Sequence, residues 1–194
     1  AFFTERNMSN LMRQVVANGL ISLGMLLVIL TGGIDLSVGL GVRRIIKKKT
    51  GITDQLGIGP AVVVAIAAGA AAGLVNGTIV ARFKLQSFTV TLATMGIVRG
   101  VVYLYTEVPI SPSHSGFRDL GATLVGVVPL SMIIMLGCYA LVWSTLNRTP
   151  AGRATVAIGG NEETVRLAGV DVQRTVMVAY MLSGALSALS GAIL

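Results

Sequence analysis

Five apolar segments, each about twenty residues long, dominate this sequence and restrict the folds that it can adopt. They cover residues 15–31, 60–81, 88–105, 125–146 and 176–194. A helix needs about 20 apolar residues to cross the hydrocarbon core of a bilayer, whereas transmembrane strands are short and alternate in hydrophobicity. Only 12% of the 194 residues are charged and the mean hydropathy is +0.81, while a soluble domain is about 25% charged. We therefore expect an all-α fold, a polytopic transmembrane helical bundle that forms a single domain over residues 1–194.

The basic residues of the chain sit mainly between the apolar segments rather than along one face. The formal net charge is +7, which in a soluble protein raises nucleic acid as a partner. Here the distribution is typical of the cytoplasmic loops of membrane proteins, so we expect contact with membrane lipid and no nucleic acid. If the five segments alternate in direction, residues 1–14, 82–87 and 147–174 share one side. Lys and Arg then favour that side as cytoplasmic by eight to six.

The residues that catalysis or metal binding requires are scarce. The chain has one Cys, Cys138, and one His, His114, and it contains no nucleotide-binding GxxxxGK[ST] motif. Cys138 lies within an apolar run, and His114 lies in a loop rich in Ser and Pro, where a lone His is usually solvated. The sequence therefore predicts no enzyme, no catalytic residues, no cofactor and no metal site. If ATP drives this protein, we expect a partner subunit to hydrolyse it.

An uncharged stretch from Gln14 to Leu30 leads into the sequence GGIDLSVG, residues 32–39. Glycines let a helix unwind without side-chain clashes, and backbone groups freed at membrane depth need partners from protein or from water in a cavity. Asp35 and Ser37 can supply such partners, which would make this a helix break bordering a polar path. The alternative is a helix that ends at the membrane interface, with Asp35 as the N-cap of the next segment. The residues by themselves favour this second interpretation.

Residues 148–174 form a polar stretch with four Arg. Residues 161–168 predict a short helix outside the bilayer, because Asn161 is a favourable N-cap and the carboxylates of Glu162 and Glu163 suit the positive end of the helix dipole. Gly159 and Gly160 are expected to supply the turn before this helix. On the residues alone, the simplest interpretation is a solvated loop that carries an ordinary capped helix.

Three polar residues interrupt the apolar segments. Arg99 is costly in lipid, so either it has a function or residues 88–105 are short or re-entrant and Arg99 lies near an interface. Asn18 and Asn76 are expected to join helices through hydrogen bonds rather than to bind a ligand.

Three stretches together resemble a known family. They are LLVILTGGIDLSVG (26–39), KLQSFTVTLATMGIVRGVVYLYT (84–106), and GRATVAIGGNEETVRLAGVDV (152–172) followed by YMLSGALSALSGAIL (180–194). They look like the permease subunit of bacterial ABC sugar importers of the ribose, xylose, galactose and galactofuranose type. The third stretch is the most specific, because a Gly-Gly-Asn-Glu followed by a Leu-Ala-Gly-Val is not a pattern of membrane helices in general.

The resemblance implies a function, partners and a place in the cell. It implies the membrane-spanning permease subunit of an ATP-driven monosaccharide importer of the bacterial inner membrane, working by alternating access. The partners implied are cytoplasmic ABC ATPase subunits, a second permease copy or paralogue, and a periplasmic sugar-binding protein. The segment coupled to the ATPase would contain Gly152, Arg153, Gly159, Gly160, Asn161, Glu162, Glu163 and Arg166. The translocation path would be bordered by Gly32, Gly33, Asp35 and Ser37.

Three other functions stay open on the sequence. A stand-alone secondary transporter would need carboxylates or proton-relay residues within the membrane, and the apolar segments hold almost none. A non-transporting remnant is an alternative, because by the resemblance the chain lacks the first helix and the later helices of the family. A permease for branched-chain amino acids is the third, since it shares the general architecture and the IDLSVG stretch favours sugars by resemblance only.

Residues 40–58 depart from the family, whose members continue here with an apolar helix. The charges of residues 43–49, two Arg and three Lys, cannot cross a bilayer as a span. The family also places residues 1–14 outside and 147–174 inside, which five alternating spans cannot do, whereas one extra crossing between about 40 and 59 would. We interpret the segment as one where a helix is missing or replaced, through a disturbed reading frame. The alternative is a basic loop that binds anionic lipid headgroups.

Overall fold

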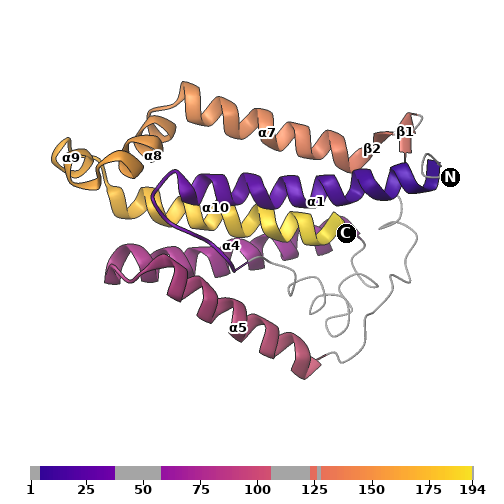
Figure 1. Cartoon of the computed structure of the whole chain (residues 1–194), viewed down its shortest axis with the longest axis horizontal. Coiled ribbons are helices and arrows are strands. Elements are labelled where there is room, and N and C mark those ends of the chain that lie inside the picture. The colour runs from indigo at the N-terminus through magenta and orange to yellow at the C-terminus, as the bar shows by residue number, and fades with distance from the viewer. Residues whose placement is uncertain (1–4, 38–57, 106–122, 126–127, 194) are drawn as a thin grey trace.

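The structure, a computed structural model, describes residues 5–37, 58–105, 123–125 and 128–193 (Figure 1). Within these residues helices dominate, and two short strands, β1 (Thr123–Val125) and β2 (Val128–Pro129), pair as an antiparallel hairpin. The helices are α1 (Glu5–Ile29), α4 (Ile58–Phe83), α5 (Ser87–Tyr105), α7 (Leu130–Arg148), α8 (Pro150–Gly160), α9 (Glu162–Leu167) and α10 (Val172–Ile193). The prediction of an all-α helical bundle is confirmed.

Four of these helices, α1, α4, α7 and α10, are long and apolar enough to cross a membrane. The fifth predicted span, α5, has a shorter apolar part, Ser87–Val101. The predicted start of the fourth span at residue 125 is wrong, because Val125 belongs to β1 and the helix begins at Leu130. The physical reason is Pro129, whose ring disfavours the helical conformation in the residue before it.

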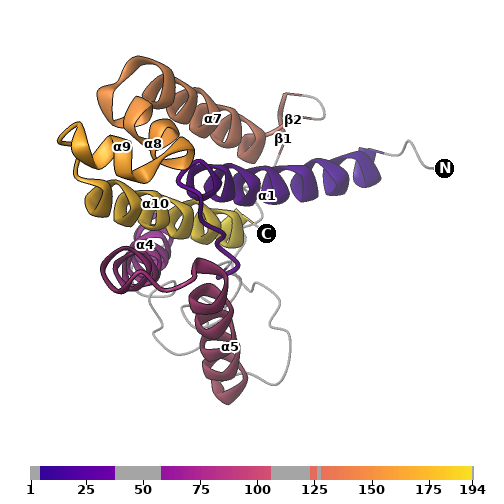
Figure 2. The ribbon, with the colours of Figure 1, turned by 60° about the vertical axis from the view of Figure 1, so that its left-hand side comes forward.

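Helix α10 lies at the centre of the bundle, between α1 and α4 (Figures 1 and 2). Helix α7 covers the other side of α1, and two apolar clusters hold α1, α7 and α10 together. The buried members of these clusters are Val16, Leu20, Met135 and Ile193, and then Leu23, Leu27, Val142 and Ala179. Helix α5 packs against α4 and then diverges from the bundle (Figure 2).

Helices α4 and α10 meet backbone to backbone along a row of glycines. Gly69, Gly73 and Gly77 are spaced by four residues and therefore lie on one face of α4. A Cβ atom on Gly73 would overlap the carbonyl oxygen of Tyr180, and one on Gly77 would lie 2.9 Å from the Cα of Met177. Small residues permit this approach where lipid offers no hydrophobic driving force, which explains why residues 60–81 are so rich in Gly and Ala.

Helices α1 and α4 run in the same direction (Figure 1). The N-terminus of α1 therefore lies at the opposite end of the bundle from the turn between α4 and α5 and from α8 and α9. This is the arrangement that the family resemblance implies, and not the one that follows if the five segments alternate. Two parallel helices agree with the extra crossing expected between about 40 and 59, although those residues and the basic cluster 43–49 lie mostly or wholly outside the described residues. The end that carries α9 holds Arg82, Lys84, Arg148, Arg153, Arg166 and Arg174, so it remains the cytoplasmic end by charge.

Candidate functional site

Helices α8 and α9 form a compact unit at the cytoplasmic end of the bundle (Figure 1). The sequence predicted α9 but not α8. Thr149 caps α8 by accepting a hydrogen bond from the backbone N–H of Gly152 (3.1 Å), and Pro150 occupies the first turn, where its missing N–H costs nothing. Gly159 and Gly160 are therefore not a turn but the last residues of α8. The change of direction falls on Asn161, whose backbone is extended (φ −158°, ψ 100°).

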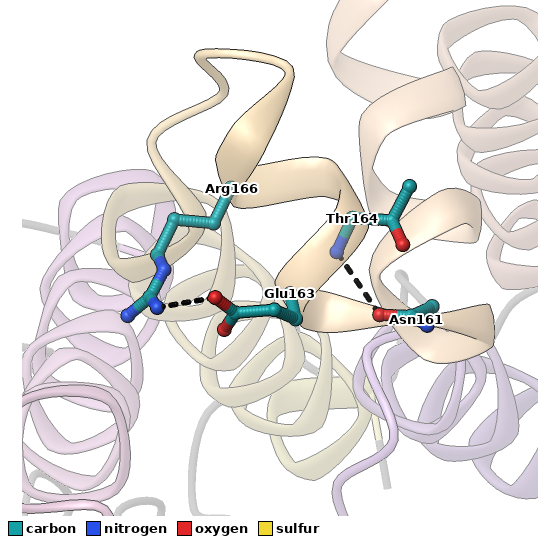
Figure 3. Close-up of polar contacts among 4 residues, drawn as sticks. All are labelled: Asn161, Glu163, Thr164 and Arg166. Carbon is teal, nitrogen blue, oxygen red and sulfur yellow. Dashed lines mark hydrogen bonds and ion pairs between the residues drawn. The ribbon is translucent and has the colours of Figure 1, made fainter.

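Helix α9 is capped at both ends, which explains how a helix of six residues is held (Figure 3). The side chain of Asn161 accepts a hydrogen bond from the N–H of Thr164 (3.0 Å), as predicted for an N-cap. At the other end Gly169 adopts the left-handed conformation (φ 83°), and the N–H groups of Gly169 and Val170 donate to the carbonyls of Arg166 and Val165. This is a Schellman motif, and Gly169 is a residue that the sequence analysis did not single out.

One side of α9 is anchored and the other is free. Val165 packs into an apolar cluster with Ile158 of α8 and Val172 of α10. Glu162, Glu163 and Arg166 are exposed, as expected, and Glu163 pairs with Arg166 at 2.6 Å (Figure 3). Leu167 is 80% exposed outside the membrane-length helices. The exposure of this leucine beside paired charges was not predicted from the sequence, where a single apolar residue in a polar stretch is no signal of its own.

Two glycines of the predicted coupling segment serve packing. Gly152 is buried, and a Cβ there would overlap the backbone of Thr145 and Leu146, so it lets α8 fold back closely on α7. Arg153 is exposed, and Gly160 has nothing within 4 Å of where a Cβ would stand. Gly159 touches a different helix, since a Cβ on it would lie 2.5 Å from the carbonyl oxygen of Leu30 at the end of α1.

Helix α1 ends at Ile29, and a second Schellman motif at Gly32 caps its C-terminus. Gly32 has φ 79°, and the N–H groups of Gly32 and Gly33 donate to the carbonyls of Ile29 and Val28 (2.9 and 3.1 Å). Gly33 passes directly over Tyr180, whose hydroxyl would lie 2.5 Å from an added Cβ. Gly32 therefore ends the helix, and Gly33 lets the chain cross α10 at close range.

Beyond Gly33 the chain runs back along the bundle in irregular conformation (Figure 1). Its freed backbone groups find partners on α5, as backbone at membrane depth requires. The N–H of Ile34 donates to the hydroxyl of Ser87 (3.1 Å), and the hydroxyl of Thr91 lies 3.3 Å from the carbonyl oxygen of Ile34. Helix α5 therefore binds the backbone of Ile34, just beyond the end of α1.

Asp35 lies at the centre of a buried polar network and is only 4% exposed. Its Oδ1 accepts from the N–H and the hydroxyl of Ser37 (2.9 and 2.6 Å), and its Oδ2 accepts from the hydroxyl of Ser183 on α10 (2.7 Å). The amide of Asn76 on α4 donates to the Ser37 hydroxyl (2.9 Å) and accepts from Thr94 on α5 (2.7 Å). The network therefore ties the break to α4, α5 and α10 at once.

This geometry combines the two interpretations of GGIDLSVG. The bond from the N–H of Ser37 to Asp35 is the one that an N-cap makes, while the bond from Ser183 satisfies a buried carboxylate from another helix. The residues that would form a following helix lie outside the described part. Asn76 joins helices as predicted, whereas Asn18 is exposed and makes no hydrogen bond with a described residue. Arg99 is exposed on α5, and His114 lies outside the described residues.

A cavity of about 540 Å³ lies between the break and α9. Its walls include Gly33 and Ser87 from the break and the start of α5, Glu162 and Arg166 from α9, and Tyr180 from α10. Volumes of this order are typical of small-molecule sites. Gly32 and Gly33 of the predicted path and Glu162 and Arg166 of the predicted coupling segment therefore line one cavity, whereas the other residues of these two groups do not. Within the described residues no cluster of His, Cys, Asp and Glu could hold a metal ion.

Comparison with known proteins decides the family. Residues 7–194 match the family described as branched-chain amino acid transport system / permease component. The chain belongs to this permease family. It is 40% identical over its whole length to the ribose import permease of Bacillus subtilis, 37% identical to the L-arabinose transport permease of Escherichia coli, and 36% identical over 98% of its length to the fructose import permease of Rhizobium meliloti. No solved structure matches this permease significantly.

This permease chain spans about 60% of the length of these relatives, from 56% to 62%. The alignment with the ribose permease of Bacillus subtilis covers 199 positions against the 194 residues of the chain. A deletion of a whole helix at residues 40–58 would need a far larger difference, so that part of the interpretation is wrong. Replacement of a helix there stays a prediction. Family membership and four membrane-length helices make the chain a multi-pass protein of the inner membrane.

Proposed function

We propose that this chain is the membrane-spanning permease of an ATP-driven monosaccharide importer. Its relationship to permeases named for ribose, L-arabinose and fructose, along nearly its whole length, carries the proposal. The α8–α9 unit supports it, because a rigid, capped and exposed element at the cytoplasmic end is what transmission of motion from a partner requires. Hydrolysis of ATP belongs to a separate ATPase subunit in this proposal.

The α8–α9 unit is the part that docks on the ATPase. Its free surface consists of the exposed charges of α9, Glu162, Glu163 and Arg166, together with Leu167. Asn161 and the packing glycines, Gly152 and Gly159, shape and seat the unit, while Arg153 and Gly160 lie at its exposed side. An apolar residue surrounded by charges resembles the anchor and rim of known interfaces.

The break in α1 borders the translocation path. Gly32 and Gly33 line the cavity at the cytoplasmic end, where a sugar would leave. Asp35 and Ser37 already bond one another and two helices, α4 and α10, so their task is to hold the wall of the path in place. A second permease copy or paralogue completes the path, and a periplasmic binding protein delivers the sugar.

The proposal is tested by uptake into vesicles. The chain is expressed with the ATPase and sugar-binding protein of its own cell, and uptake of labelled ribose, arabinose, fructose and leucine is measured with and without ATP. We expect ATP-dependent uptake of a monosaccharide and co-purification of the ATPase.

The alternatives give different results in the same experiment. Uptake of leucine instead of sugar would place the chain with the amino-acid importers that give the family its description. Uptake without ATP would indicate a secondary transporter. Absence of both uptake and ATPase binding would indicate a non-transporting remnant.

A further inference from the structure

Gly159 joins the α8–α9 unit to the break in α1. It is the penultimate residue of α8, and a Cβ on it would stand 2.5 Å from the carbonyl oxygen and 3.2 Å from the carbonyl carbon of Leu30. Contacts of a real Cβ under 3.0 Å essentially do not occur, so no side chain fits here without a shift of backbone. The Cα of Gly159 therefore bears directly on the last turn of α1.

The contact falls where α1 stops being a helix. Leu30 lies two residues before Gly32, whose left-handed conformation ends the helix, and an added Cβ on Gly159 would also lie 3.7 Å from the N–H nitrogen of Gly32. Backbone against backbone leaves no flexible side chain between the two elements to absorb a displacement. A displacement of α8 is consequently passed to the turn itself.

The two parts of the chain that meet at Gly159 and Leu30 are each held in place by other contacts. On one side the cluster of Ile158, Val165 and Val172 fixes α8 and α9 to each other and to the start of α10. On the other side Asp35 and Ser37 fix the chain beyond the turn to Ser183 and Asn76. The turn from Leu30 to Gly33 is the short piece of chain between these two fixed bodies.

We propose that Gly159 is the positioning residue through which the α8–α9 unit moves the break in α1. The proposal rests on the proposed function, since the motion is that of ATPase docking on α9. When the ATPase displaces α9, the rigid unit carries Gly159 against Leu30, and the turn rotates the wall formed by Gly32 and Gly33. The end of α1 thereby changes its position relative to α4, while Asp35 and Ser37 stay bonded to Ser183 and Asn76.

The test is Gly159→Ala in the complete importer, with Gly137→Ala as the matched control. Gly137 is also helical, on α7, but has nothing within 4 Å of an added Cβ. We measure ATPase binding, ATP hydrolysis and sugar uptake. In Gly159→Ala we expect ATPase binding to persist and the number of ATP molecules hydrolysed per sugar to rise at least about tenfold, while Gly137→Ala keeps the wild-type ratio.

A purely structural role would lower binding, hydrolysis and uptake together and leave that ratio unchanged, which would overturn the proposal. Failure of the proposed function is distinct, because the wild-type chain itself would then neither bind the ATPase nor transport sugar.

A second measurement covers the case in which Gly159→Ala does not fold. Spin labels are placed on the otherwise native chain, with Cys138→Ser, at Val156 and Ile29, and in a second sample at Ile29 and Leu74, all exposed positions. When ATP binds the complex, we expect the first distance to stay constant and the second to change. A change in the first with a constant second distance would show that the unit slides past the break, and would overturn the proposal.

Discussion

Ser183 donates a hydrogen bond of 2.7 Å to Asp35, which lies 148 positions earlier in the chain. Both side chains are buried, at 3% and 4% exposure, and within the described residues no Lys or Arg pairs with this carboxylate. Its two oxygens are instead served by hydroxyl and N–H donors. The hydrogen bond from Ser183 to Asp35 therefore attaches the chain that follows the end of α1 to α10.

Replacement of Asp35 tests this attachment. Asp35→Ala leaves three donors without their acceptor, and hydrogen bonds to charged groups contribute about 1.5–3 kcal/mol each in soluble proteins but only about 0.6 kcal/mol on average between membrane helices. We expect a loss of about 1–3 kcal/mol in the free energy of unfolding, measured by denaturant titration in detergent. Ser183→Ala should cost about 1 kcal/mol, and its effect should nearly vanish when Asp35 is already Ala. Additive effects of the two changes would contradict the direct bond.

The glycine row of α4 predicts a strong position dependence. Gly73→Leu should prevent α4 from reaching α10, because its side chain would enter the backbone of Tyr180. We expect loss of the folded state or a stability loss beyond the roughly 1–3 kcal/mol usual for overpacking. Gly137→Leu serves as the control because its surroundings are open, and thermal unfolding in detergent compares the two. Equal melting temperatures would argue against close packing at Gly73.

The N-cap of α9 predicts that position 161 needs a side chain that accepts a hydrogen bond. Asn161→Ala removes the acceptor for the N–H of Thr164 and should cost about 1 kcal/mol, whereas Asn161→Asp keeps an acceptor and should cost much less. Hydrogen exchange of the α9 amides is the measurement. Faster exchange in both variants alike would mean that the cap does not hold the helix.

The exposure of Leu167 predicts that its replacement changes binding of the ATPase but not the stability of the fold. Its side chain is 80% exposed, so Leu167→Ala should leave the melting temperature unchanged while weakening ATPase binding at least about tenfold, or about 1.4 kcal/mol. Arg174→Ala is the control, since Arg174 is exposed on α10 and pairs only with Asp171 among the described residues. Affinity for the purified ATPase is measured by titration, and equal affinities of the two variants would exclude Leu167 from the interface.

The parallel course of α1 and α4 predicts which residues face each side of the membrane. In a Cys138→Ser background, Asn10→Cys should react with an impermeant maleimide added outside intact cells, and Gln86→Cys should react only after the membrane is opened. Both positions are exposed. Asn10 lies near the start of α1 and Gln86 between α4 and α5, and the start of α1 and the turn between α4 and α5 are at opposite ends of the bundle (Figure 1). Labelling of both cysteines from the same side of the membrane would contradict the parallel course of α1 and α4 and support the alternating arrangement.

The sequence was sufficient for the spans and for α9, because apolar length and capping residues are local signals. It was insufficient for α8, because Pro150, Gly152, Gly159 and Gly160 suggest a turn. Pro at the first turn is compatible with a helix. Gly152 and Gly159 are explained by contacts with α7 and with the end of α1 that no local pattern contains, whereas Gly160 has open space around it. The break at Gly32 could be foreseen, but not the partners of Asp35, since Ser183 and Asn76 are ordinary polar residues on distant helices.

Strict alternation of the five apolar segments would give α1 the wrong direction, whereas the extra crossing implied by the family resemblance agrees with the structure. Strict alternation of apolar segments is a sound rule only when every crossing is visible as an apolar segment. Residues 43–49 carry five charges, so the sequence shows no apolar segment that would mark a crossing between about 40 and 59. The conflict between the family resemblance and the alternation of five segments was the sign of this in the sequence, and the parallel helices α1 and α4 agree with the resemblance.

The glycine row of α4 also has a consequence for biogenesis. Its partner surface on α10 is translated roughly a hundred residues later, which at about 5–20 residues per second takes about 5–20 seconds. During that interval α4 lies in the bilayer with its most closely packing face turned to lipid or to the insertion machinery. Assembly of this permease therefore waits for a late helix to arrive, and anything that slows translation between the two lengthens the life of an unpaired α4.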